Sequence, residues 1–306
     1  MTEQPYVVVL AGGEGCRLSS LTRALYGYDL PKQFAVLAGD RSLLQTTVER
    51  AMQLTSPDRI AVVVTAHHEQ IAREQLFPYP AVALLVQPTN LDTAPGMLLP
   101  LARIVARSWR SRVIFLPSDH YIPNAAPILH ALAHTEHGPL RDRISLVGVS
   151  PTRPEVEYGW ITCGRRIHDG AFEVAQFREK PDADTAEDLW RRGGLWNTFI
   201  QAGPVNLFWK LAHHHIPAHA AALERYAVSI GGVYEHASLD AAYRTMRPSS
   251  FSRDVLAHAS HLGVVQVTGS GWSDWGTPQR VFASLAGTAA HERLVQRIRG
   301  DLALAG

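Results

Sequence analysis

Short apolar runs alternate with helical stretches through the first half of the chain, and this alternation constrains the fold most strongly. The apolar runs at residues 6–11, 60–65, 81–86 and 113–116 have the length and composition of buried strands. Segments 42–54, 67–76 and 93–109 lie between them and read as helices. Such alternation predicts a parallel sheet covered on both faces.

The second half is less regular. We expect strands at 144–149, 158–163, 172–178 and 263–268, and helices at 185–192, 205–214, 218–226, 278–286 and 289–304. The predicted fold is a Rossmann-like three-layer α/β sandwich with a mostly parallel, partly mixed central sheet and C-terminal helices. We expect one domain over residues 1–276, with residues 277–306 forming a helical cap packed on it.

Composition narrows the class of protein. Of the 306 residues, 46% are hydrophobic and 19% charged, which is typical of a globular protein with a sizeable core. The formal net charge of +1 argues against a nucleic-acid partner. Two cysteines exclude a disulfide framework, and no apolar run approaches the roughly 18 residues of a membrane span. The N-terminus has no basic stretch typical of a signal peptide, so we expect a cytoplasmic protein without a membrane partner.

A glycine-rich loop, Leu10-Ala11-Gly12-Gly13-Glu14-Gly15-Cys16-Arg17, follows the first predicted strand. Glycines let the backbone approach a ligand, and the N–H groups of such a loop can bind an anion. Neither the dinucleotide pattern nor a Walker A loop fits, because the required spacing and the Gly-Lys-Ser/Thr are missing. Arg17 and Lys32 follow the loop and suit a nucleoside triphosphate, although a tight turn with ordinary surface cations is the alternative.

Five segments in order resemble the sugar-1-phosphate nucleotidyltransferases, in particular the mannose-1-phosphate guanylyltransferase branch. They are LAGGEGCR with PKQF at 31–34, QPTNLDTAP at 87–95, PSDH at 117–120, FREKPD at 177–182 and WSDWG at 272–276. The resemblance spans roughly residues 6–285. It implies a nucleotidyltransferase fold like that of the glycosyltransferase-A enzymes, with residues 1–276 as the catalytic domain.

The resemblance also implies roles for individual residues. Arg17, Lys32 and Lys180 would be the catalytic cations. The nucleotide would contact Leu10, Ala11, Gly12, Gly13, Gly15, Gln87, Thr93, Ala94 and Ser118.

Two aspartates are candidate metal ligands. Asp119 follows a predicted strand, and Asp274 lies between two tryptophans more than 150 residues later. Mg²⁺ binds through one or two carboxylates together with substrate phosphates and water, so two distant aspartates meeting at the sheet edge would suit Mg²⁺ or Mn²⁺. A helix cap or loop turn is the alternative role for Asp119. The family resemblance implies the metal role for both.

The sugar phosphate is assigned to residues of the second half. The resemblance implies that Lys180 pairs with the phosphate, that Glu179 accepts hydrogen bonds from sugar hydroxyls, and that Gly159 and Asn197 complete the site. Lysine is a compact charge for a phosphate and a carboxylate accepts from hydroxyls. Without the resemblance, a surface Glu-Lys pair before a proline turn would be the simpler interpretation.

Three positions depart from the family pattern. Phe199 stands where the family has glycine after Trp-Asn-Ser, and it would be strained if that glycine needs positive φ. Cys16 replaces the more usual Thr, and Leu91-Asp92 replaces Arg-Asn before the Thr-Ala-Pro segment. These departures bear on the sugar rather than on the fold. His120 is interpreted as a loop residue packing near the site, and His213–His215 as a solvated helix end.

The predicted function is transfer of a nucleotidyl group, with GMP from GTP favoured, to a sugar 1-phosphate, with mannose 1-phosphate favoured. The products would be a nucleotide sugar and pyrophosphate. Alternatives are the same chemistry with another substrate pair, a non-catalytic regulatory paralogue that binds a nucleotide sugar, a molybdopterin guanylyltransferase and a glycosyltransferase. Apolar positions in 281–304 could serve a homodimer contact.

Overall fold

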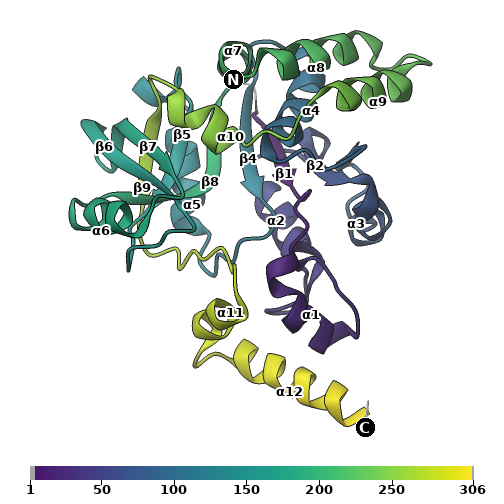
Figure 1. Cartoon of the computed structure of the whole chain (residues 1–306), viewed down its shortest axis with the longest axis vertical. Helices are drawn as coiled ribbons and strands as arrows, with labels where there is room; N and C mark the ends of the chain where they lie inside the picture. Colours follow the sequence, from purple (N-terminus) through teal and green to yellow (C-terminus); the bar gives the residue numbers. More distant parts are fainter. Residues whose placement is uncertain (1–3, 305–306) are drawn as a thin grey trace.

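The computed structural model describes residues 4–304 and is built around one nine-stranded mixed sheet (Figure 1). The strand order is β3-β2-β1-β4-β8-β5-β9-β7-β6, with β8 also pairing β6. The strands are β1 Tyr6–Leu10, β2 Ile60–Thr65, β3 Ala83–Gln87, β4 Arg112–Pro117, β5 Ser145–Val149, β6 Gly159–His168, β7 Ala171–Glu179, β8 Leu195–Pro204 and β9 Gly263–Val267. The predicted α/β fold with a central sheet is confirmed.

Parallel pairing is concentrated in the first half of the sheet. Strand β1 pairs β2 and β4 in parallel, and β2 pairs β3 in the same way. Strands β5 and β9 form the other parallel pair, and the remaining pairings, including β4–β8 and β6–β7, are antiparallel. The loops that follow β1, β3 and β4 therefore lie at one edge of the sheet.

Helices cover both faces of the sheet. They are α1 Ser19–Tyr26, α2 Leu43–Ala51, α3 Glu69–Leu76, α4 Thr93–Val105, α5 Ala126–His134, α6 Ala183–Arg191, α7 Val205–His215, α8 Pro217–Ser229, α9 Glu235–Thr245, α10 Phe251–Asp254, α11 Pro278–Leu285 and α12 Ala289–Leu304. Six short 3-10 turns complete the described elements, at Cys16–Leu18, Lys32–Phe34, Pro57–Arg59, Ala66–His68, Gly138–Leu140 and Leu256–His258.

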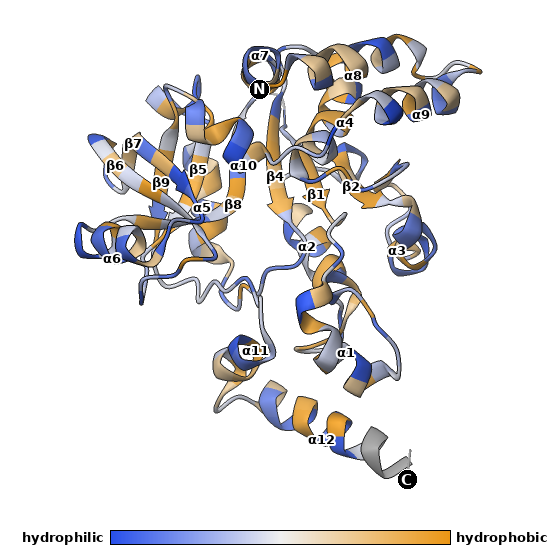
Figure 2. Cartoon of the chain, viewed as in Figure 1, coloured by the Kyte–Doolittle hydropathy of each residue, from blue (hydrophilic) through white to orange (hydrophobic). Residues whose placement is uncertain are grey.

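Side chains of successive strand residues enter two separate cores. Val7 and Val9 of β1 pack with residues of α1, α2 and α3, while Val8 packs on the other face with residues of α4. Such alternation follows from the two-residue period of a strand. Because both faces are covered, the central strands are apolar throughout, and Figure 2 shows β1, β2 and β4 in hydrophobic colours.

Several helices and one strand of the structure are not predicted from the sequence. The sequence pattern predicts neither the helices α1, α5, α9 and α10 nor the strand β8. β8 is nonetheless a central strand, joining β4 on one side to β5 on the other. Its register on β5 shifts between Leu146 and Gly148, and Phe199 within it has a φ of 60°. The interrupted strand therefore lacks the regular two-residue alternation that marks a strand in a sequence.

The C-terminal helices pack on the rest of the chain. Figure 1 shows α11 and α12 at the lower end, with α12 near α1. Val281, Leu285 and Leu294 are buried in the same hydrophobic cluster as Leu21 of α1. These three side chains are therefore buried within the chain itself, and a homodimer contact through other positions of residues 281–304 stays a prediction.

Among residues 4–304, no helix is both long and apolar enough to cross a bilayer.

Helix α2 begins with a capping box. The Ser42 hydroxyl accepts from the Gln45 N–H at 3.1 Å, and the Gln45 side chain accepts from the Ser42 N–H at 3.2 Å. Ser42 also donates to Gln75 of α3 at 2.6 Å. This cap fixes the start of the helix that packs beside β1 and the 32–34 turn.

Replacing Ser42 with alanine should lower the free energy of unfolding by about 1 kcal/mol, because the cap and the bond to α3 are both lost. Urea unfolding of the purified chain measures this. Ser20→Ala, on the exposed face of α1, is the control and should stay within about 0.5 kcal/mol of wild type. Equal stabilities of the two variants would contradict the assigned cap.

Candidate active site

A cavity of about 450 Å³ lies at the edge where β1, β3 and β4 end. The loops after these three strands supply most of its lining, and β8 contributes one side chain. The lining includes the predicted site residues Leu10, Gly12, Gly13, Gln87, Thr93, Ser118 and Asp119, and also Gln33, Asn90, Asp92, Gly96, His120 and Phe199. The volume is within the range usual for small-molecule sites.

The glycine-rich loop folds against the segment that contains Lys32. Gly15 has a φ of 63°, and a side chain there would come within 2.7 Å of the Lys32 backbone nitrogen. Gln33 is buried, and its Nε2 donates to the carbonyls of Ala11 at 3.1 Å and Gly13 at 2.6 Å. Ala11 and Gly15 therefore shape the loop rather than line the cavity. Gln33 was not predicted as a site residue, although its position next to Lys32 in the sequence could have indicated that it lies at the site.

Gln87 is held in one orientation. Its Oε1 accepts from the Tyr243 hydroxyl at 3.1 Å, and the amide lies between two glycines. A Cβ on Gly12 would be 2.8 Å from Gln87 Nε2, and one on Gly96 would be 3.3 Å from its Oε1. Small residues are therefore needed on both sides of the amide. Because Oε1 is engaged, Nε2 is the group that Gln87 can offer to a ligand.

The N-terminus of α4 is fixed by a distant segment. The Thr93 hydroxyl accepts from the Phe251 N–H at 2.8 Å, and the Ala94 N–H donates to the Ser249 carbonyl at 2.9 Å. Thr93 lines the cavity, whereas Ala94 is buried and is absent from the lining. The adjacent Asp92 caps the helix by accepting from the Thr93 N–H at 2.6 Å.

Ser118 ties two strand ends together. Its N–H and its hydroxyl both donate to the Leu10 carbonyl, at 3.0 and 2.8 Å. This fixes the loop after β4 against the start of the glycine-rich loop and places Asp119 at the cavity.

Lys32 joins the two predicted metal ligands. Its buried ammonium donates to the backbone carbonyl of Asp274 at 2.5 Å and lies 3.1 Å from Asp119 Oδ2. Burial would raise the pKa of Asp119, but the charges of Lys32 and then His120 outweigh it, and the net pKa is lowered. Asp119 is therefore an anion at neutral pH.

The Asp274 carboxylate is held mainly through one oxygen. Oδ1 accepts from the Tyr158 hydroxyl at 2.6 Å, Arg280 at 2.8 Å and the Gly276 N–H at 3.1 Å. Among the described residues no group donates a hydrogen bond to Oδ2, and the Arg17 guanidinium lies 3.9 Å from it. Burial favours the neutral acid, but the hydrogen bond from Tyr158 and the charges of Lys32 and Arg280 give a net lowered pKa.

These two aspartates fit a hard divalent cation that is completed by its substrate. Both are anionic, Lys32 contacts the carboxylate of Asp119 and the backbone carbonyl of Asp274, and one Asp274 oxygen accepts no hydrogen bond among the described residues. Within the described part of the chain, no three His, Cys, Asp or Glu side chains form a ready-made metal cage. That donor set suits Mg²⁺, which usually takes one or two carboxylates together with substrate phosphates and water.

Two exposed cations face the same glutamate. Arg17 and Lys180 have exposed fractions of 55% and 58%, and their nitrogens lie 3.7 and 4.0 Å from Glu157 Oε2. Ion pairs this exposed contribute little to stability, so both side chains remain available to a phosphate. Glu157 was not singled out from the sequence, because nothing in its local pattern marks it.

Gly159, Glu179 and Asn197 are close neighbours. A Cβ on Gly159 would be 2.7 Å from Glu179 Oε2 and 3.3 Å from the Asn197 Cβ. Gly159 and Glu179 are also paired across β6 and β7. Burial is the main cause that raises the pKa of Glu179. The structure thus brings together three residues that the sequence interpretation assigned to the sugar.

Phe199 stands where the family has glycine, and its backbone adopts a conformation that is costly for a residue with a side chain. Its φ is 60°, in the left-handed region that side chains rarely occupy. Its N–H donates to Asn197 Oδ1 at 3.2 Å, and its ring lines the cavity. Backbone strain of this kind typically costs about 1–3 kcal/mol.

The histidines behave as expected. His120 lies near the site and accepts from the Trp272 indole N–H at 3.2 Å. His213–His215 form the end of α7, where His213 pairs with Glu224.

The chain belongs to the nucleotidyl transferase family, whose model matches residues 6–290. The family resemblance inferred from the motifs is confirmed by this match.

Named relatives are similar over most of the chain. The mannose-1-phosphate guanylyltransferase RfbM of Salmonella typhimurium is 29% identical over 301 residues, covering 96% of this chain and 61% of RfbM. The alginate biosynthesis protein AlgA of Pseudomonas fluorescens is 31% identical over 278 residues, covering 88% of this chain and 56% of AlgA. The chain thus spans about three fifths of the length of these relatives.

Solved structures agree with the fold. A Thermus thermophilus protein, described as a mannose-1-phosphate geranyltransferase, superposes with a TM-score of 0.79 at 28% identity, covering 93% of this chain and 80% of that one. HddC of Yersinia pseudotuberculosis, solved with GMP-PN, has a TM-score of 0.55 at 16% identity, covering 94% of this chain and 99% of that one. The second likeness shows the fold alone.

The free-energy cost of the left-handed backbone at Phe199 can be measured by comparing the stabilities of Phe199→Gly and Phe199→Ala. Both variants lose the ring, but only alanine keeps a Cβ in the left-handed conformation. The glycine variant should therefore be more stable by about 1 kcal/mol in urea unfolding. Ala202→Gly is the control within the same strand and should destabilise, since no positive φ is needed there. A more stable alanine variant at 199 would contradict the strain.

The raised pKa of Glu179 predicts a pH-dependent stability. Its folded pKa lies above the ordinary 4.5, so wild type loses stability as the pH rises through that range and the buried carboxylate ionises. Glu179→Gln should therefore gain stability over wild type at about pH 7 and little at about pH 4. Chemical unfolding at both pH values measures the difference, with Glu74→Gln on the exposed face of α3 as control. A gain in stability by Glu179→Gln that is larger at about pH 4 than at about pH 7 would contradict the raised pKa of Glu179.

Proposed function

We propose that the chain transfers GMP from GTP to mannose 1-phosphate, releasing pyrophosphate and forming a nucleotide sugar. The observation that carries the proposal is the convergence of Lys32, Asp119 and the Asp274 loop beside a cavity edged by a glycine-rich loop. Family membership and the names of the relatives support it. Residues 1–276 would form the catalytic domain and 277–306 its cap.

The reaction would be a direct displacement. An oxygen of the sugar phosphate forms a bond to the α-phosphorus of GTP, while the bond from that phosphorus to the bridging oxygen breaks and pyrophosphate leaves. No covalent enzyme intermediate is needed. Catalysis of this kind rests on positioning and on neutralising charge.

The nucleotide would lie at the ends of β1, β3 and β4. The loop at Gly12 and Gly13 leaves space for the nucleoside, and Thr93 and Ser118 offer polar groups beside it. The Gln87 amide presents Nε2, which can donate to a base carbonyl such as that of guanine. Thymine and uracil also have such carbonyls, so Gln87 alone does not select the base.

The phosphates would be met by cations from three segments. Arg17, exposed beside Asp274, is placed to neutralise the triphosphate. Lys32 keeps the Asp119 and Asp274 loops together and adds positive charge beneath them. Lys180 would leave Glu157 to orient the sugar phosphate, and Glu179 and Asn197 would bind sugar hydroxyls. Mg²⁺, held by Asp119 and Asp274, would supply further charge neutralisation when bound.

The decisive experiment measures pyrophosphate release with Mg²⁺ over a matrix of nucleoside triphosphates and sugar 1-phosphates. Turnover with GTP and mannose 1-phosphate that is lost in Asp119→Ala would support the proposal. Turnover with another pair would keep the chemistry and change the substrates. If no pair turns over while a nucleotide sugar raises the melting temperature, the chain is instead a regulatory paralogue.

Lys180 provides a sharper test of the sugar-phosphate half. Lys180→Ala should lower kcat/KM for the sugar phosphate by about 10²-fold, because one charged contact to the transferring phosphate is lost. Arg178→Ala, which removes an exposed cation two residues earlier near the end of β7, is the control and should stay near wild type. Similar losses in both variants would mean that only the general charge of the surface matters.

A further inference from the structure

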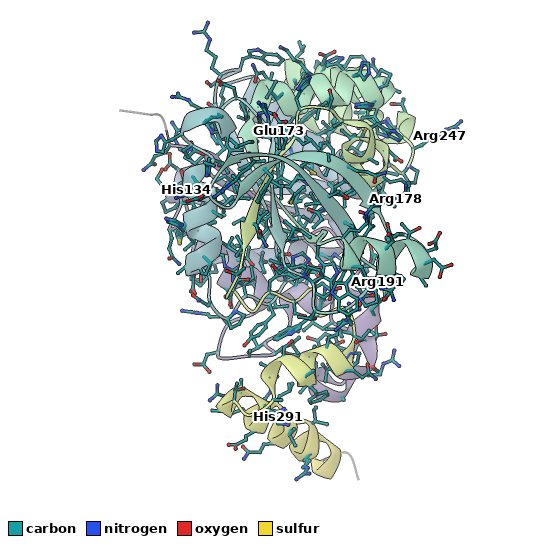
Figure 3. All side chains as sticks on the ribbon, turned by 90° about the vertical axis from the view of Figure 1, so that its left-hand side faces the viewer. His134, Glu173, Arg178, Arg191, Arg247 and His291 are labelled. Atoms are coloured by element: carbon teal, nitrogen blue, oxygen red, sulfur yellow. The ribbon has the colours of Figure 1, made fainter. Side chains whose placement is uncertain are left out.

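Three histidines cluster on a surface remote from the cavity. His130 and His134 lie one turn apart on α5, and His168 ends β6, at the turn before β7. Figure 3 shows His134 on the flank of the molecule. None of the three lines the cavity at the ends of β1, β3 and β4. The proposed reaction makes no use of them.

The two rings are hydrogen-bonded to each other, at a separation that also suits two ligands of one metal ion. The Nε2 atoms of His130 and His134 are 3.1 Å apart. Two imidazole nitrogens at this separation, each ~2.05 Å from a metal, subtend about 98° at it. That angle lies between the ~90° of square-planar and the ~109° of tetrahedral coordination.

His168 is the third available imidazole. Its ring centroid is 5.7 Å from that of His134. Its Nδ1 lies 3.0 Å from the Asp169 carbonyl, which can only accept, so Nδ1 carries the proton. The lone pair is then on Nε2, and a backbone carbonyl behind the ring is the usual support for a metal-binding histidine.

We propose that His130 and His134, with His168 as a third ligand, bind a divalent transition metal such as Zn²⁺. Imidazole favours Zn²⁺, Ni²⁺ and Cu²⁺ over Mg²⁺, so this site differs in chemistry from the pair of aspartates at the cavity. No ready-made cage of three ligands exists among the described residues. In this proposal the pair binds the ion first, and His168 joins as the third ligand when its ring moves toward His134 from the 5.7 Å centroid separation. The bound ion cross-links α5 to that turn.

Calorimetric titration of the full chain with Zn²⁺, in buffer containing Mg²⁺, tests this site. Wild type should bind Zn²⁺, and the double variant His130→Ala/His134→Ala should bind at least ~10-fold more weakly. His168→Ala should bind more weakly than wild type but more tightly than the double variant. All three substituted side chains are partly or fully exposed, and melting curves without metal should show unchanged folds.

A second histidine pair provides the matched control. His214 and His215 have ring centroids 4.6 Å apart, but consecutive helical residues point ~100° apart and cannot chelate one ion together. His214→Ala/His215→Ala should therefore keep the Zn²⁺ affinity of wild type. Unchanged affinity in the α5 variant, or a loss confined to the α7 variant, would overturn the proposal. Failure of the turnover experiments would leave this result unaffected, because the readout is metal binding alone.

Discussion

The buried ammonium of Lys32 is the interaction on which the arrangement of the site depends. It connects the turn after the glycine-rich loop, the end of β4 and the loop after β9, which are far apart in the sequence. A buried lysine is costly unless it is paired and hydrogen-bonded. Here Asp119 supplies the charge and the Asp274 carbonyl supplies the hydrogen-bond acceptor. The same ammonium thus links the Asp119 carboxylate to the backbone of Asp274.

The two halves of the mixed sheet carry different parts of the candidate site. The parallel strands β1, β3 and β4 end together and surround the cavity with loops. The antiparallel strands β6 and β7 carry Gly159 and Glu179, Lys180 directly follows β7, and β8 lies between the halves with Asn197 and Phe199. Phe199 both lines the cavity and binds Asn197, so the strained residue stands where the two halves meet. Strain that persists beside a cavity indicates a local role for the side chain.

The regular strands and helices could be predicted from the sequence because buried positions produce a recognisable pattern of apolar residues. Strands β1, β2 and β4 are apolar on both faces, and the capping box of α2 joins Ser42 and Gln45, three residues apart. Strand β8 could not be predicted in this way, since positive φ at Phe199 and a register shift interrupt its pattern.

Among the site residues, those that directly follow strands could be placed at the sheet edge from the sequence. Gln33, Tyr243 and Glu157 could not, because they act through contacts that form only in the folded chain. Arg17 and Lys32 look alike in the sequence, yet one is exposed and the other is buried.

The most direct test of this account is the rate of pyrophosphate release by Lys32→Gln at saturating substrates, together with its unfolding curve. Glutamine keeps a donor for the Asp274 carbonyl but removes the charge that faces Asp119. The account predicts a rate lowered by about 10²–10³-fold in a chain that still unfolds cooperatively. A folded variant with a rate within a few-fold of wild type would contradict the claim that this ammonium organises the site.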